Sequence, residues 1–121
     1  MKNIIKILEG LDDVDKLNSR MIFLGASDLD IGSPTSHNFG KSESLNNFVL
    51  CDATISNGST PVKSVLFLPS YTSNIIFTGL KVELAGTERL ANITINSNKT
   101  SYTGTITGGA WTVYFFGFRK L

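Results

Sequence analysis

The sequence predicts a mostly β fold, an antiparallel β-sandwich or jelly-roll-like barrel preceded by a short N-terminal amphipathic helix. Three observations predict it. The first twenty residues repeat their apolar positions at three- and four-residue steps, later apolar residues come in short alternating runs, and turn signals separate those runs. About six or seven strands joined by such turns are typical of sandwiches and barrels. We therefore expect a helix over residues 1–19 and one β-sandwich domain over residues 20–121.

The N-terminal helix is predicted from an apolar stripe opposite a charged face. The stripe consists of Ile4, Leu8, Leu11, Val14, Leu17 and Met21. A helix of about four turns is marginal alone, and Gly10 costs it roughly 1 kcal/mol, so the stripe needs a surface to cover it. Docking on its own sheet, bundling with the same helix of neighbouring copies and a disordered tail all remain open.

The first half of the β domain contains two predicted strands and a long polar segment. Met21–Leu24 leads into Gly25, and Ala26–Lys41 is a long loop or a weakly paired edge strand. Leu45–Ile55 is the next predicted strand, and one of its faces consists of Val49, Cys51, Ala53 and Ile55. Asn57-Gly58 then supplies the positive backbone angles of a tight hairpin turn.

The second half contains the clearest strand signals. Val62–Leu68 and Ile75–Leu84 come first, followed by a turn at Ala85-Gly86. The last three runs, with turn signals between them, predict an antiparallel meander through Thr87–Ile95, Ser101–Thr107 and Trp111–Arg119. The final run is apolar or aromatic on both faces. We therefore expect one face in the core and the other in an interface.

Composition limits the kinds of partner. A chain of 121 residues with a net charge of +1 has no overall field to attract nucleic acid or an anionic membrane. No stretch is long and apolar enough to insert into a membrane, and no secretion signal precedes the domain, so we expect synthesis in the cytoplasm. The single cysteine, Cys51, is expected to be a buried, inert thiol.

Catalytic patterns are sparse. The chain has one histidine and no Gly-x-Ser-x-Gly elbow, and Asp28-Leu29-Asp30 lacks the remaining ligands of a calcium-binding EF-hand loop. A glycosidase pair of Asp52 with Glu83 or Glu88 stays open, because folding can bring distant carboxylates together. We predict a protein that is not an enzyme and needs no cofactor or metal.

The layout of the chain resembles the receptor-binding or tail-fibre tip domains of tailed bacteriophages and prophages. The resemblance rests on Phe23–Ser27, on Ser44–Leu50 after the polar loop, and on the closing aromatic strand Val113–Phe118. It implies a homotrimeric β-structured tip in the virion, made in the bacterial host cytoplasm, that contacts other virion proteins and binds host-surface saccharides or cell-wall polymers. The long stalk of that family is absent, which favours a small baseplate or tip component.

The resemblance and the residue types suggest two groups of functional side chains. For sugar binding, aromatic platforms and polar partners are expected at Tyr71, Tyr102, Trp111, Asp28, Asp30, His37 and Asn38. For assembly, the expected residues are Ile4, Leu8, Leu11, Leu17, Phe116 and Phe118. The alternative function is a structural virion component, such as a capsid decoration or baseplate connector protein, without receptor binding.

Overall fold

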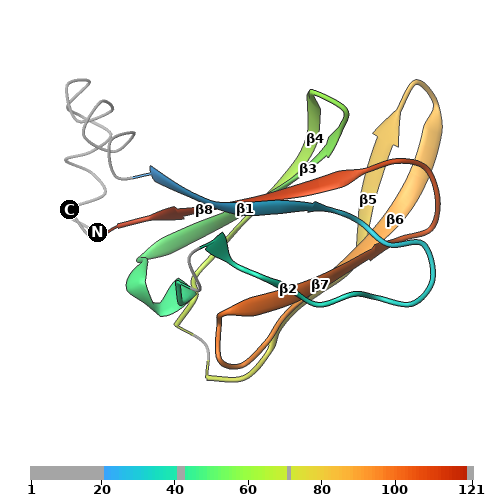
Figure 1. Cartoon of the computed structure of the whole chain (residues 1–121). Coiled ribbons are helices and arrows are strands. Elements are labelled where there is room, and N and C mark those ends of the chain that lie inside the picture. The colour runs from blue at the N-terminus through green and yellow to red at the C-terminus, as the bar shows by residue number, and fades with distance from the viewer. Residues whose placement is uncertain (1–20, 41–42, 71, 120–121) are drawn as a thin grey trace, which may run out of the picture.

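A computed structural model describes residues 21–40, 43–70 and 72–119. Within these residues the fold is mostly β, as predicted, and two four-stranded antiparallel sheets lie face to face (Figure 1). The helix predicted over residues 1–19 lies outside the described residues, as does Tyr71. One sheet has the order β1-β8-β3-β4 and the other β2-β7-β6-β5.

Eight strands make up the two sheets in the described part of the chain. In chain order they are β1 (Met21–Asp28), β2 (His37–Asn38), β3 (Leu50–Asn57), β4 (Thr60–Phe67), β5 (Ile75–Leu84), β6 (Thr87–Ile95), β7 (Ser101–Ile106) and β8 (Thr112–Phe118). The segment Ala26–Lys41 was expected to be a long loop or a weakly paired edge strand. Its first residues instead continue β1 past Gly25 to Asp28, and further on the two-residue β2 pairs with the edge of β7.

Tight turns join the hairpins where the sequence predicts them. β3 and β4 pair up to Asn57 and Thr60, with Gly58 at φ 59°, and β5 and β6 are joined by Ala85-Gly86 with φ of 52° and 82°. Two-residue loops with positive φ match the twist of the strands they connect. The turn at Ala85-Gly86 is confirmed. The hairpin at Asn57-Gly58 is also present, but its two loop residues are Gly58 and Ser59, and only Gly58 has a positive φ.

The predicted meander is wrong in its last step. β6 pairs with β7, but β8 does not pair with β7; it lies in the other sheet between β1 and β3 (Figure 1). The connection from Ile106 to Thr112 therefore crosses from one sheet to the other. A strand that is apolar on both faces suits this central position, where it has a neighbour on each side.

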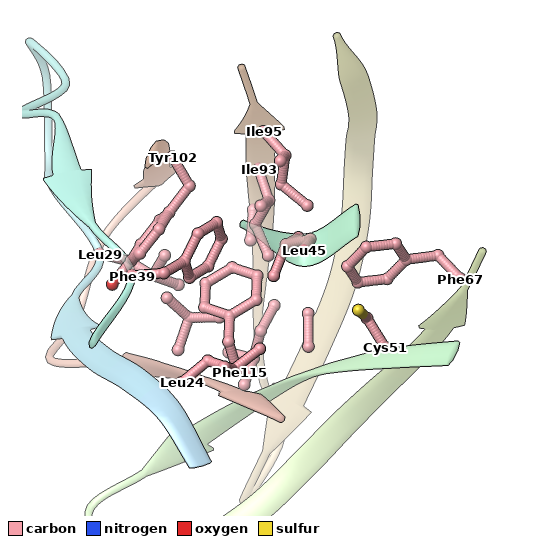
Figure 2. Packing of buried hydrophobic residues seen from close by; sticks show 14 of the residues in the cluster. Leu24, Leu29, Phe39, Leu45, Cys51, Phe67, Ile93, Ile95, Tyr102 and Phe115 are labelled. Atoms are coloured by element: carbon pink, nitrogen blue, oxygen red, sulfur yellow. The ribbon is translucent and has the colours of Figure 1, made fainter. Parts of the chain in front are cut away.

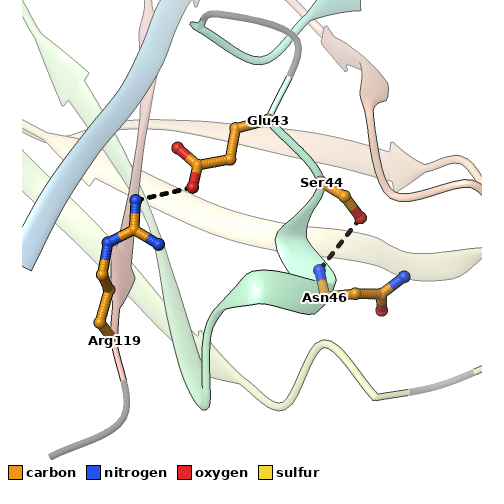
Figure 3. A network of polar contacts seen from close by, with 4 residues as sticks. All are labelled: Glu43, Ser44, Asn46 and Arg119. Atoms are coloured by element: carbon orange, nitrogen blue, oxygen red, sulfur yellow. Dashed lines mark hydrogen bonds and ion pairs between the residues drawn. The ribbon is translucent and has the colours of Figure 1, made fainter.

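The predicted strand Leu45–Ile55 begins later than expected. Leu45–Asn47 form a short 3-10 helix that starts where the Ser44 hydroxyl accepts a hydrogen bond from the Asn46 N–H at 3.2 Å (Figure 3). Residues such as Ser favour this capping role over continuing a strand. Val49, which was expected on the buried face, precedes β3 and is 51% exposed.

A cation fixes the last strand to this turn. The Arg119 guanidinium donates to a Glu43 carboxylate oxygen at 2.7 Å (Figure 3), and it also lies 4.9 Å from the centre of the Phe48 ring. Phe48 is buried and packs against Gly117 of β8. The segment before β3 is thus held against the end of β8.

The core lies between the two sheets and is rich in aromatic rings. The Phe115 ring centre is 5.1 Å from that of Phe39 and 4.4 Å from that of Tyr102, which belongs to the opposite sheet (Figure 2). At another point of the core, Phe67 of β4 meets Phe77 of β5 at 5.4 Å. Each fully buried large side chain of this kind contributes about 1.5–3 kcal/mol.

A buried lysine joins two connections at the edge of the core. Lys99 is 1% exposed, and its ammonium donates to the carbonyl of Ser73 at 2.8 Å and to that of Ser97 at 3.1 Å. Its φ of 61° completes the predicted turn between β6 and β7. The segment between β4 and β5 is therefore tied to that turn.

The free edges of both sheets are short or irregular. β1 and β5 each contain a bulge, β4 carries Pro61 and Lys63, and β2 has only two residues. These four strands are the outer members of their sheets.

Candidate functional site

The polar residues expected to bind sugar are divided between the two sheets. Asp28 ends β1, and its carboxylate accepts a hydrogen bond from the Thr112 hydroxyl at 3.0 Å. The Asp30 carboxylate accepts from the Thr35 N–H at 2.8 Å. Asp28 therefore joins β1 to β8, whereas Asp30 stabilises its own connection, as Asp side chains commonly do in turns.

Asp30, His37 and Asn38 all come to the edge of β7. The backbone of Asp30 bridges to Thr105, and His37 and Asn38 form β2. The His37 ring centre is 5.6 Å from that of Tyr102, whereas Asn38 is exposed. Three of the four expected polar residues are thus brought to one sheet edge.

Tyr102 and Trp111, expected as sugar platforms, are 1% and 5% exposed. The Tyr102 hydroxyl lies 2.8 Å from the Ser27 hydroxyl, and burial raises the pKa of Tyr102. Neither ring has a free face on which a sugar could stack, so these two assignments are wrong. The physical reason is that both residues point between the sheets, where apolar area leaves water.

The exposed aromatic residues lie instead on the outer side of the β1-β8-β3-β4 sheet. We call this surface the aromatic face; its side chains are Met21, Phe23, Leu50, Asp52, Thr54, Ser64, Leu66, Tyr114, Phe116 and Phe118. On β8 the inward residues Val113 and Phe115 are fully buried, while the three outward aromatic residues are half-buried. This confirms that β8 is apolar on both faces, with one of them in the core.

The aromatic rings of this face form a cluster across β1 and β8. Phe23 is 57% exposed, and its ring centre lies 5.6 Å from that of Phe116 and 6.5 Å from that of Tyr114. Tilted pairs at these distances are favourable arrangements of aromatic rings. The cluster therefore offers ring surface on a rigid two-strand support.

A chain of hydrogen bonds runs beside the rings on β3 and β4. The Thr54 hydroxyl donates to one oxygen of Asp52 at 2.8 Å, and it lies 2.8 Å from the Ser64 hydroxyl. Because the Thr54 hydroxyl has a single proton, Ser64 donates to Thr54. Asp52 is thus the acceptor at the end of this chain.

The other oxygen of Asp52, Oδ1, is covered and has no hydrogen-bond partner. Burial raises the pKa of Asp52, and the hydrogen bond from Thr54 partly opposes that rise. In the described residues, ion pairs join Lys81 to two glutamates and Arg119 to Glu43, and none includes Asp52. A covered acceptor without a donor costs about 1–3 kcal/mol, which makes Asp52 the least satisfied polar group on this face.

Sequence reasoning missed this group because it depends on strand register. Phe23 is opposite Phe116, which is opposite Asp52, which in turn is opposite Leu66, so one row combines four strands. Alternation along Leu50–Thr54 places Asp52 outward, but only the pairing shows what surrounds it. The open alternative of a carboxylate pair with Glu83 or Glu88 is not formed, because those residues lie in the other sheet and bind Lys81.

Comparisons with known proteins do not place the chain in a family. No family model matches it, and no curated protein or solved structure is significantly similar to it. In residues 21–40, 43–70 and 72–119 there is no helix long and apolar enough to cross a membrane. The same residues contain no group of three or more His, Cys, Asp and Glu side chains that could hold a metal ion.

Proposed function

We propose that this chain is a phage or prophage tail or baseplate tip protein that binds a host-surface saccharide or cell-wall polymer as a homo-oligomer. The observation that supports sugar binding best is the aromatic cluster of Phe23, Tyr114 and Phe116 beside the polar chain of Asp52, Thr54 and Ser64. Sugars present flat C–H faces and many hydroxyls, so their sites combine ring surface with hydrogen-bonding groups.

Both components of the proposed site stand on hydrogen-bonded strands of one sheet. A pyranose ring would rest on Phe23 and Tyr114, and its hydroxyls would donate to Asp52 on the adjacent strand β3. Because strands hold their side chains in fixed register, little ordering is needed when a ligand arrives. The polar residues Asp30, His37 and Asn38 belong to the other sheet and have no part in this proposal.

Assembly would use the end of the aromatic face where β1 begins. Met21 is opposite Phe118, and Phe118 is opposite Leu50, so three apolar side chains share a row there. Outward apolar side chains in a row are typical of surfaces that contact protein. The homotrimer, the part that residues 1–19 play in it and a jelly-roll relationship of the sheets remain predictions.

One observation favours the alternative of a structural virion component. Leu66 and Leu68, near the end of β4, are 64% and 63% exposed. Aliphatic side chains of this kind suit contact with another protein better than contact with a sugar.

Retention of the purified full chain on insoluble cell-wall polysaccharide tests the proposed function. Phe23→Ala and Tyr114→Ala each remove ring surface and should reduce retention at least tenfold. Ile76→Ala is the matched control, because Ile76 is 60% exposed on the other sheet and should bind as the parent does. Equal retention of all four proteins, or no retention of any, would favour the structural alternative.

A further inference from the structure

We propose that the aromatic face binds its saccharide through a protonated amino group, which rests against Phe116 and pairs with Asp52. The inference depends on the proposed function and narrows the ligand to cationic amino sugars. It assigns Asp52 as the residue that selects them.

The register places the carboxylate and the rings in one row. Phe116 of β8 lies between Phe23 of β1 and Asp52 of β3, with each pair directly opposite across neighbouring strands. Side chains directly opposite one another on a sheet face are about 5 Å apart at Cβ. One small group can therefore touch both a ring face and the carboxylate.

The hydrogen-bonding capacity of Asp52 calls for a donor that the described residues do not supply. An ionised carboxylate accepts at both oxygens, but only the oxygen facing Thr54 has a partner. Asp52 as a whole is half-buried and its Oδ1 is covered, so a ligand would reach the carboxylate at Oδ2. Oδ2 accepts from Thr54 and has the capacity to accept a second hydrogen bond from a ligand.

The charge of the site favours an ammonium group over a hydroxyl. An ammonium group brings three N–H donors and a positive charge, whereas a hydroxyl brings one donor and none. None of the ion pairs in the described part of the chain neutralises Asp52. The adjoining ring faces attract the same cation, because the π-face of an aromatic ring is negative.

The test compares glucosamine oligomers with their N-acetylated and non-amino counterparts. Titration calorimetry on the full chain at about pH 6.5 keeps the sugar amine protonated. We expect the glucosamine oligomer to bind at least tenfold more tightly than the other two, with added salt weakening that binding alone. Asp52→Asn preserves the shape of the side chain and removes its charge, so it should abolish the preference.

Asp28→Asn is the matched control. Asp28 is also an aspartate of the same sheet with one hydrogen bond from a threonine hydroxyl, but its partner is Thr112 and it lies outside the ring cluster. This variant should keep the preference, and circular dichroism checks that both variants are folded.

The possible outcomes separate the two proposals. Equal binding of all three oligomers, or a preference that survives Asp52→Asn or disappears in Asp28→Asn, would overturn the inference and leave sugar binding intact. Binding to none of them and to no cell-wall polysaccharide would overturn the proposed function as well.

Discussion

Truncating two adjacent phenylalanines of β8 should have very different effects on stability. Phe115 is fully buried between Phe39 and Tyr102, and replacing a core phenylalanine by alanine costs about 3–5 kcal/mol. Phe116 is half-buried on the aromatic face, where water can fill the space that the ring leaves. For Phe116→Ala we expect a cost of about 1 kcal/mol or less.

Urea unfolding followed by tryptophan fluorescence measures both variants. Trp111 is the single tryptophan and is buried, so its emission should shift when the chain unfolds. Domains of this size have free energies of unfolding of about 5–15 kcal/mol, so Phe115→Ala removes a large share of the total. We expect its melting temperature to fall by about 10 °C or more, and that of Phe116→Ala by a few degrees.

Comparison of Phe115→Ala with Phe116→Ala also tests the register of β8. A slip by one residue moves every side chain of a strand to the opposite face. Equal costs for the two variants, or a greater cost for Phe116→Ala, would show that the inward and outward faces of β8 have been assigned the wrong way round.

Four further substitutions or treatments test other parts of the structure. Gly117→Ala places a methyl group 2.6 Å from the Phe48 ring and should destabilise the fold by about 1–3 kcal/mol in thermal unfolding; an unchanged midpoint would contradict this packing. Lys99→Met leaves two carbonyls without their donor and should cost about 1–3 kcal/mol in urea unfolding; an unchanged free energy of unfolding would contradict these contacts. Burial raises the pKa of Cys51 to about 12, so a thiol reagent at about pH 8 should react slowly with folded protein and rapidly in urea. Because burial raises the pKa of Asp52, its contribution to stability is fully present below the unfolded pKa and is lost as pH rises through the folded pKa. Asp52→Asn should therefore raise the free energy of unfolding at neutral pH, and the gain should shrink towards about pH 4; a constant gain would exclude titration of Asp52 as its cause.

Local signals predicted the hairpins well, because the turn residues specify the reversal by themselves. Ala85-Gly86 adopt the expected positive φ, Gly58 does so without Asn57, and the turn before Ser101 is where it was placed. Local signals do not predict the sheet to which a strand belongs. A turn such as Gly108-Gly109 reverses the chain whether the next strand pairs with its predecessor or crosses the core, and only packing decides between them.

The candidate site was harder to predict than the fold. Tyr102 and Trp111 have the residue types of a sugar platform, but burial takes precedence over type in both. Asp52 lies between residues of two other strands, β4 and β8, so no window of sequence contains its environment. The outward aromatic residues of β8 were identified because their alternation is local.

The irregular free edges of the two sheets affect whether copies of this chain can aggregate by edge-to-edge strand pairing. Wherever identical chains are concentrated, the exposed backbone N–H and C=O groups of flat edge strands can pair from one copy to the next. Bulges in β1 and β5, the missing N–H of Pro61 and the charge of Lys63 interrupt such pairing. Copies of this chain can therefore meet through side chains on a face, which gives a contact of defined size, while fibrous polymerisation along the backbone is suppressed.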